Sequence, residues 1–199
     1  MDRVSFIKLA NLICEKGEDA FMELGIIYLQ VIKRRFAQMK EQGDGVFEQL
    51  DETDIHWTFN NASNSIAVIV KHMRGNMLSR WTNFLTSDGE KSNRHRDLEF
   101  INTIPSKQEL LTVWNEGWIV LFEALEQISA EDLLKHVKIR EQPILVLEAV
   151  ERQLAHYASH VGQIIYIGKQ LKGNEWKSLS IPKGKSTEYL QQMKQRYGK

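Results

Sequence analysis

Two histidines, His156 and His160, stand four positions apart in a segment whose apolar residues repeat with helical spacing. Four residues of an α-helix turn by about 400°, so the two imidazoles would lie about 40° apart on one face, one turn above the other. This arrangement can chelate a divalent metal ion. A third ligand must come from another element, and three protein ligands would leave a coordination position open for water or substrate, as in catalytic zinc sites.

The third ligand is predicted to be His72, near the middle of another helical segment. A di-iron carboxylate centre is not expected, because no glutamate is followed three residues later by a histidine. The residues between His156 and His160 are Tyr, Ala and Ser, so the glutamate base of a His-Glu-x-x-His metalloprotease is also missing. Three imidazole nitrogens suit Zn²⁺, Ni²⁺ or Fe²⁺, and Zn²⁺ or Ni²⁺ is expected first.

A structural interpretation stays open beside this one. Two histidines in the second half of a helix can also be core or capping residues. The other histidines, His56, His95 and His136, fall in predicted loops or helix ends, where exposed or capping roles are expected.

Composition narrows the class of protein. The chain has 199 residues, with 26 basic and 26 acidic side chains, and this balance removes the general electrostatic argument for nucleic acid or an anionic membrane as partner. The single cysteine, Cys14, excludes an intramolecular disulfide and is expected to be a buried or incidental thiol. No segment has the pattern of a membrane span or a signal peptide, so a cytoplasmic protein is predicted.

The apolar spacing predicts an all-α protein, with no convincing paired strand. The first long helix is expected from about Asp19 to Lys40, ended by the breaker Gly43-Asp44-Gly45. The second is expected from about Ser63–Ser65, whose hydroxyls can cap it, to about Leu85. The apolar stripe of the first helix comprises Leu24, Ile27, Tyr28, Val31, Ile32 and Phe36.

Two further long helices follow. The third starts at Ser106, with Glu109 completing a capping box, and continues through Leu125. The fourth is expected to have Pro143 in its first turn and to end at Gly173.

These helices can bury their stripes against one another as a four-helix bundle with long crossover connections, since about twenty residues join the first helix to the second and the second to the third. One bundle domain is predicted over residues 19–199, after an N-terminal extension, residues 1–18, with a short helix near residues 3–15. The tail after Gly173 is expected to pack on the bundle through Trp176, Leu179 and Ile181, before a short helix near residues 187–196.

Five segments carry a resemblance to a known family. They are Asn64–Met73, Gly75–Trp81, Glu116–Trp118, Arg152–Ile164 and Trp176–Gly184. Together they look like the DinB/YfiT-like superfamily, whose members are regarded as metalloenzymes, and within it like an uncharacterised bacterial branch. The resemblance covers about residues 20–187, and three histidines in this order on two helices are more specific than the pair alone.

The resemblance implies a four-helix bundle, commonly dimeric, with a divalent metal on His72, His156 and His160. Characterised relatives include metal-dependent transferases of low-molecular-weight thiols and thiol-dependent isomerases. The leading interpretation is therefore a metal-dependent enzyme that transfers a small thiol to an electrophile or hydrolyses a small substrate. The alternative is a non-catalytic dimeric bundle that binds a metal or a small molecule.

Either reaction needs a pocket that restricts water. Aromatic walls, cationic anchors for a substrate carboxylate, and polar groups that orient the ligand imidazoles are predicted to build it. The predicted aromatic walls are Trp81, Trp118 and Tyr157, and the predicted cationic anchors are Arg94, Arg96 and Arg152. The predicted polar groups that orient the imidazoles are Asn76 and Gln163. The aromatic residues can equally be core, and the polar ones helix-surface contacts. A homodimer through faces of the first and third helices is also expected.

Overall fold

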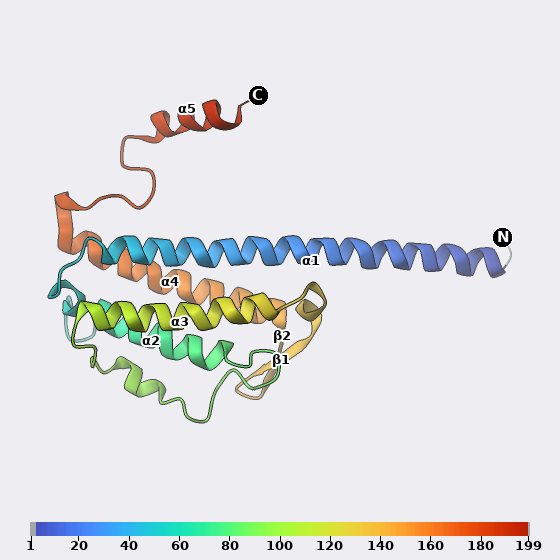
Figure 1. The fold of residues 1–199 in the computed structure, drawn as a ribbon, viewed down its shortest axis with the longest axis horizontal. Helices are drawn as coiled ribbons and strands as arrows, with labels where there is room; N and C mark the ends of the chain where they lie inside the picture. Colours follow the sequence, from blue (N-terminus) through green and yellow to red (C-terminus); the bar gives the residue numbers. More distant parts are fainter. Residues whose placement is uncertain (1–2, 199) are drawn as a thin grey trace.

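The computed structural model describes the backbone of residues 3–198 and the side chains of residue 17 and residues 19–198. In that part of the chain the α-helices are α1 (Arg3–Phe47), α2 (Ile66–Trp81), α3 (Lys107–Gln127), α4 (Val146–Lys172) and α5 (Ser186–Tyr197) (Figure 1). Short 3-10 turns occupy Asp54–His56, Arg96–Phe100, Ala130–Leu134 and Gly173–Glu175, and β1 (His136–Ile139) pairs with β2 (Gln142–Leu145). The predicted helical character is confirmed.

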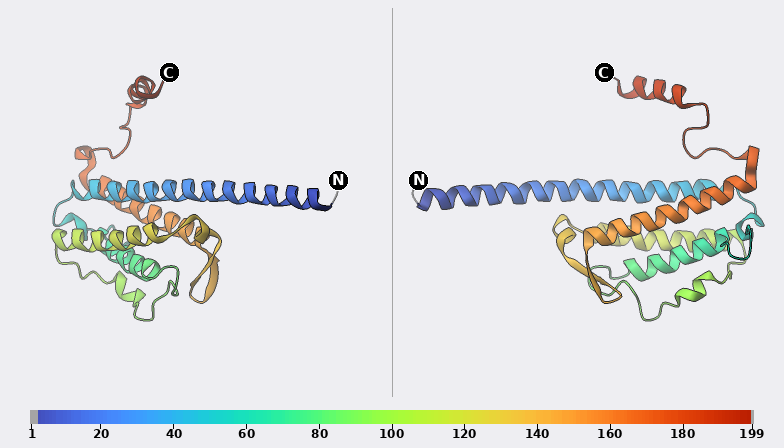
Figure 2. Two further views of the ribbon diagram at one scale, coloured as in Figure 1. Left: turned by 45° about the vertical axis from the view of Figure 1, so that its right-hand side comes forward. Right: turned by 180° about the vertical axis from the view of Figure 1, so that it is seen from behind.

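Helices α1 to α4 lie side by side, and α5 stands apart from them (Figures 1 and 2). The closest packing joins α2 to α3 and α1 to α4. One buried aromatic residue from each of the four helices meets in the core: Phe36, Trp81, Trp118 and Tyr157. The Phe36 ring centroid lies 6.1 to 6.5 Å from the other three. Because Tyr157 directly follows His156, this aromatic core fixes the part of α4 that carries His156.

Helix α1 is longer than predicted. It runs unbroken through both the expected short helix and the expected breaker. Gly43 lies inside this helix and leaves room for Trp114, because a Cβ atom at Gly43 would overlap the indole ring. Nε1 of that ring donates a hydrogen bond to Oδ1 of Asp44 at 2.7 Å. The glycine thus permits close packing instead of ending the helix. The predicted boundary between residues 18 and 19 falls within α1, and the division into extension and domain stays a prediction.

The middle of α1 also departs from the predicted apolar stripe. Leu24 and Ile27 are exposed, whereas Ile32 and Phe36 are buried in the core. The difference arises because Gly25 and Leu29 form the buried face of α1 at this level, with Gly25 against Ala130, so that Leu24 and Ile27 lie on the exposed face.

Several predicted helix ends are correct, although α2 ends at Trp81, before the predicted Leu85. Ser65 caps α2 by accepting a hydrogen bond from the backbone N–H of Val68 at 3.3 Å, and Ser106 caps α3 by accepting from that of Glu109 at 3.1 Å. Helix α4 ends at Gly173, which has a positive φ of 51°. These local signals place both helices that carry the candidate ligands.

A short hairpin precedes α4, where no strand was expected. Pro143 lies in β2, opposite Lys138, so it is not in the first turn of α4, which begins at Val146. The turn residues Arg140 and Glu141 both have positive φ. Asp88 supports this conformation, because its carboxylate accepts from the backbone N–H groups of both turn residues, at 2.9 and 2.7 Å.

The C-terminal tail follows the prediction in part. Trp176 and Leu179 pack against the core, but α5 contributes no buried side chain among the described residues. Within the described range, no helix is both long enough and apolar enough to cross a lipid bilayer.

Candidate metal centre

Three histidine side chains converge between helices α2 and α4. His72 lies on α2, and His156 and His160 lie one turn apart on α4. Nε2 of His156 is 3.4 Å from Nε2 of His72 and 3.0 Å from Nε2 of His160. One donor atom from each residue lies within 4.8 Å of the others, so the three residues can hold a metal ion.

Side-chain oxygens hold the Nδ1 atoms of two of these imidazoles. Nδ1 of His72 lies 2.9 Å from Oε2 of Glu99, and Nδ1 of His160 lies 2.9 Å from Oε1 of Gln163. An ionised carboxylate and an amide oxygen only accept hydrogen bonds, so both Nδ1 atoms donate. In the neutral imidazole the lone pair is then on Nε2, the atom nearest the other histidines.

Burial favours the neutral form of the two α4 histidines. Burial, and then the proximity of His160 and His72, lowers the pKa of His156 from 6.5 to about 3. Burial also lowers the pKa of His160, although its hydrogen bond with Gln163 acts in the opposite direction. Because neutral imidazole is the form that binds metal, protons do not compete for His156 near neutral pH.

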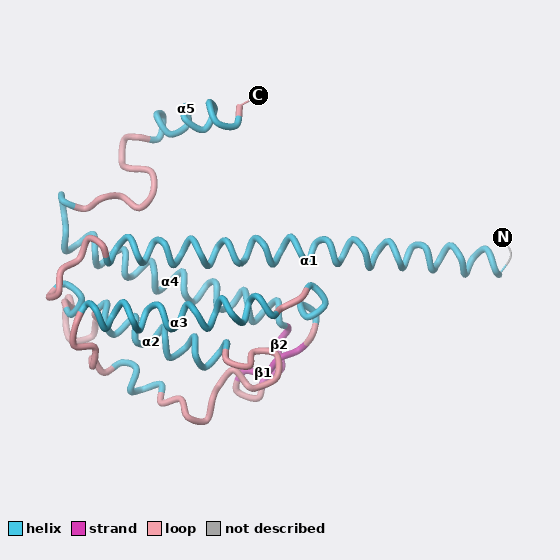
Figure 3. The backbone as a smooth tube through the Cα atoms, in the orientation of Figure 1, coloured by secondary structure: helices cyan, strands magenta, loops and turns pink. Residues whose placement is uncertain are grey.

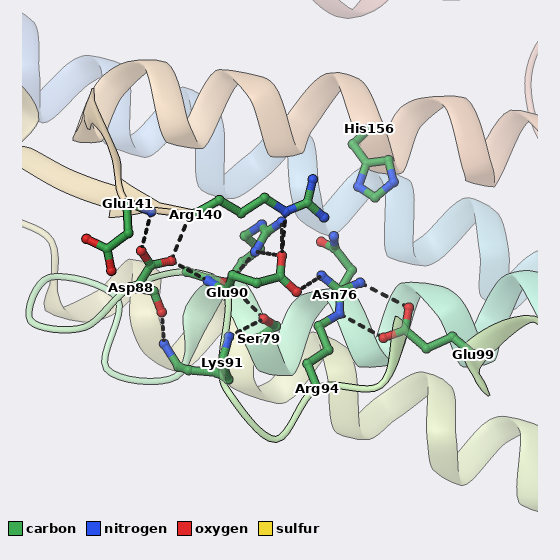
Figure 4. A network of polar contacts seen from close by, with 12 residues as sticks. Asn76, Ser79, Asp88, Glu90, Lys91, Arg94, Glu99, Arg140, Glu141 and His156 are labelled. Carbon is green, nitrogen blue, oxygen red and sulfur yellow. Dashed lines mark hydrogen bonds and ion pairs between the residues drawn. The ribbon is translucent and has the colours of Figure 1, made fainter. Parts of the chain in front are cut away.

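Glu99 is a site residue that the sequence analysis did not identify. It lies in the 3-10 turn Arg96–Phe100, and its buried carboxylate accepts from Nε of Arg94 at 2.8 Å and from Nη2 at 3.0 Å (Figure 4). Burial by itself would raise the pKa of Glu99, but hydrogen bonds from His72 and Arg94 hold that pKa below its usual range. An ionised carboxylate therefore faces Nδ1 of His72, as in many carboxylate–histidine–metal arrangements.

Gly75 provides the room for this carboxylate. It lies on α2, three residues after His72, and a Cβ atom there would overlap the carboxyl group of Glu99. Glycine in a helix interior costs about 0.5–1 kcal/mol relative to alanine, and here it permits the close approach of a charged group. Phe100 completes this side of the site, because its ring stacks on His72 with 4.8 Å between ring centroids.

The loop that carries Glu99 connects α2 to α3 and is held at several points (Figures 3 and 4). Glu90 accepts hydrogen bonds from Arg80 at 3.2 Å and from Arg140 at 3.0 Å. Asp88 ties the loop to the hairpin turn, and Lys71 donates to two backbone carbonyls that flank Glu99, at 2.7 and 2.8 Å. Contacts with α2 and the hairpin thus fix a long loop against His72.

Asn76 and Tyr157 belong to a buried polar chain beside the histidines. The hydroxyl of Tyr157 donates to Oδ1 of Asn76 at 2.9 Å and accepts from Nε1 of Trp81 at 3.1 Å. Burial raises the pKa of Tyr157 well above its ordinary value. Tyr157 is thus a neutral structural group, and the amide oxygen of Asn76 holds Tyr157 instead of an imidazole.

The remaining predicted pocket residues are dispersed. Trp81 and Trp118, predicted as pocket walls, fill the aromatic core because their helices turn them inward. The arginines form no common anchor: Arg94 is paired with Glu99, Arg96 is exposed with its guanidinium 5.0 Å from the Phe100 ring centroid, and Arg152 is exposed on α4. Of the predicted polar groups, Gln163 alone contacts a candidate ligand in the part of the chain described.

The three histidines and the two groups that hold them fall within one family match. Residues 23–185 match the family described as "Protein of unknown function (DUF1572)". A comparison with curated proteins finds no match. Since the family match covers most of the chain and all five of these residues, the protein belongs to the DUF1572 family.

Proposed function

We propose that His72, His156 and His160 bind one divalent metal ion, and that the protein is a metal-dependent enzyme with the DinB/YfiT-like four-helix-bundle fold. The observation that carries the proposal is the convergence of three Nε2 atoms between α2 and α4. The resemblance of the segments around these histidines to that superfamily supports it.

The donor set fits such an ion. Nitrogen ligands at about 2.0–2.1 Å from a tetrahedral ion lie about 3.3 Å apart, close to the 3.4 and 3.0 Å found here. Three neutral imidazoles with facing lone pairs repel one another, and a cation between them would remove that cost. Three nitrogen ligands suit Zn²⁺ or Ni²⁺, and also Fe²⁺.

An open coordination position is part of the proposal. In the described part of the chain the cluster contains three residues that can ligate and no fourth. This count favours a catalytic arrangement over a closed structural site, which would use four protein ligands. A bound ion of this kind would supply a thiolate or hydroxide nucleophile near neutral pH by lowering the pKa of a coordinated thiol or water.

The protein's own residues would orient and shield this centre. Glu99 and Gln163 fix the direction of two imidazoles, and Phe100 covers one of them. From the resemblance to the DinB/YfiT-like superfamily we infer transfer of a small thiol to an electrophile, with hydrolysis of a small substrate as the second reaction of the same class.

Metal analysis of protein purified without an affinity tag tests the site. Wild-type protein is expected to bind one ion per chain, and His156→Ala to lower the affinity at least about 100-fold while circular dichroism stays helical. His136→Ala, an exposed histidine on the hairpin, is the matched control and should bind like wild type. Unchanged binding by His156→Ala would refute the site.

Thiol consumption against a panel of electrophiles then tests the enzyme. The metal-loaded wild type should consume thiol, and the His156→Ala variant should not. A loaded protein that consumes no thiol and hydrolyses no ester would favour the non-catalytic binding protein instead.

We also propose that two copies of the chain pair through α1 and α3. The middle of α1 exposes Leu24, Ile26 and Ile27, and α3 exposes Ile119. Aliphatic side chains grouped on helix faces favour burial against a second copy. Light scattering at tens of micromolar protein should give twice the mass of the chain, and the mass of a single chain would contradict pairing.

A further inference from the structure

A cavity of about 880 Å³ lies beside the histidine cluster, between α4 and the segment that leads into α2. Gln163 belongs to both, since it lines the cavity and its Oε1 accepts from Nδ1 of His160. Ser159, the residue before His160, also lines it, as does Ile69, one turn before His72 on α2. The three histidines do not line the cavity, which adjoins the candidate metal centre through Gln163.

The chemistry of the lining is uncharged. Among the residues that line this cavity there is no lysine, arginine, aspartate or glutamate. Its aromatic walls are Trp57, Phe59 and Tyr166, of which Phe59 is 78% and Tyr166 65% exposed. Exposed aromatic side chains gathered around a concavity favour burial against an apolar ligand, and the amides and hydroxyls between them can orient it.

A second cavity makes the contrast clear. It measures about 640 Å³, and Lys71, Arg74, Lys91 and Arg94 line it. The buried Glu99 also lines it, and this carboxylate holds His72 through Nδ1, the ring nitrogen away from the cluster. Each cavity thus meets the ligand set through a side chain that holds an imidazole by Nδ1, Glu99 for the cationic cavity and Gln163 for the uncharged one, and the two differ in charge and in aromatic lining.

We propose that the uncharged cavity binds the body of a neutral, flat, aromatic substrate, with its reacting end toward His160. The inference rests on the proposed function and narrows its substrate class, because the carboxylate anchors expected from sequence do not line this cavity. Its volume lies in the range of pockets that enclose small organic ligands, roughly 300–1,000 Å³. Gln163 then has two roles, since it contacts the bound molecule and holds the imidazole.

Equilibrium binding of two matched probes to the metal-free protein tests this proposal. The probes are 2-naphthol, neutral at about pH 7, and 2-naphthalenesulfonate, which has the same ring system and a negative charge. We expect 2-naphthol to bind with one site per chain and at least about tenfold more tightly, since no cation in the lining can pair with the sulfonate. Equal or tighter binding of the sulfonate would overturn the inference.

Variants locate the binding. Tyr166→Ala and Phe59→Ala are each expected to weaken 2-naphthol binding about fivefold. Tyr197→Ala is the control, because Tyr197 on α5 is 68% exposed, close to the 65% of Tyr166, and lies outside the cavity. Unchanged binding by both cavity variants, or equal weakening by the control, would place the probe elsewhere and refute the proposal.

A Co²⁺ titration of the same proteins separates the two proposals. Wild type and both cavity variants should bind Co²⁺ equally, since neither substituted side chain is a ligand. If wild type binds Co²⁺ but not 2-naphthol, the cavity assignment fails and the metal site stands. If wild type does not bind Co²⁺, the proposed function fails whatever the probe does.

Discussion

Two imidazoles of the candidate metal centre are held by hydrogen bonds of equal length and different origin. His72 is held by Glu99, from a loop 27 positions away, and His160 by Gln163, three positions along its own helix; both distances are 2.9 Å. The first contact is buried and bound into ion pairs, whereas the second is exposed. Similar geometry can therefore rest on very different amounts of supporting structure.

The largest expected effect comes from breaking the buried contact. Glu99→Ala would leave the guanidinium of Arg94 buried with only its longer contact to Glu90, at 3.5 Å. Removing one partner of a buried ion pair typically costs about 3–5 kcal/mol of unfolding free energy, and a loss at the lower end of this range is expected because Glu90 remains. Metal affinity should fall about 10- to 100-fold, because His72 loses the group that orients it. Urea denaturation and Zn²⁺ titration measure the two effects, and a stability loss below about 1 kcal/mol would show that the ion pair is not an important support.

A substitution on α2 should disturb the same contact without removing the carboxylate. Gly75→Ala places a methyl group where the Glu99 carboxyl lies, so a loss of about 1–3 kcal/mol is expected, with weaker metal binding. Gly162→Ala on α4 is the matched control, since a Cβ atom there meets nothing within 4 Å. That variant should gain about 0.5–1 kcal/mol from helix propensity. Similar losses in both variants would argue against a specific clash with Glu99.

A second local contact, distant from the histidines, tests what short-range hydrogen bonds contribute. Hydrogen bonds from Lys135 and from the backbone N–H of Ser129 lower the pKa of Asp132 from 3.8 to about 2. Because the folded-state pKa lies below the unfolded one, this stabilisation is complete above about pH 5 and is lost as the pH falls toward 2. Asp132→Asn should cost about 1 kcal/mol at pH 6 and less at pH 3, measured by denaturation at both values. A pH-independent difference would contradict the assignment.

The smallest effect is expected at the exposed contact between Gln163 and His160. Gln163→Ala should change the unfolding free energy by less than about 0.5 kcal/mol, as for most surface substitutions. Metal affinity should fall by about tenfold or less, because α4 itself still directs His160. If Gln163→Ala weakened metal binding as much as Glu99→Ala, the local and the long-range contacts would support the metal centre equally, contrary to what we expect.

The difference between local and long-range contacts also explains which features could be predicted from the sequence. The phase of His156 and His160, the capping serines 65 and 106, and the end of α4 at Gly173 all depend on residues within about one helical turn. The residue types and spacing in the sequence therefore predict these features directly.

The long-range contacts were not predictable in this way. Glu99 lies in a 3-10 turn without apolar periodicity, and its role depends on a loop fixed by Glu90 and Lys71. The one available signal was its position five residues after Arg94, within a loop rich in charges. Gly43 was misinterpreted as a breaker because the Trp114 ring that explains it lies on another helix.

The hairpin was missed for a related reason. Its turn, Arg140-Glu141, lacks the asparagine and glycine that usually adopt positive φ, and Asp88 supplies the stabilisation from a distant loop.

Tyr157 follows His156 directly, and this adjacency restricts rotation of α4. Successive helical residues point about 100° apart, so turning α4 to move His156 would pull the Tyr157 hydroxyl away from Asn76 and Trp81. The protein therefore holds His156 and His160 in place before any metal ion binds. Little ordering entropy should be lost on binding, and affinity would depend mainly on the coordination bonds themselves.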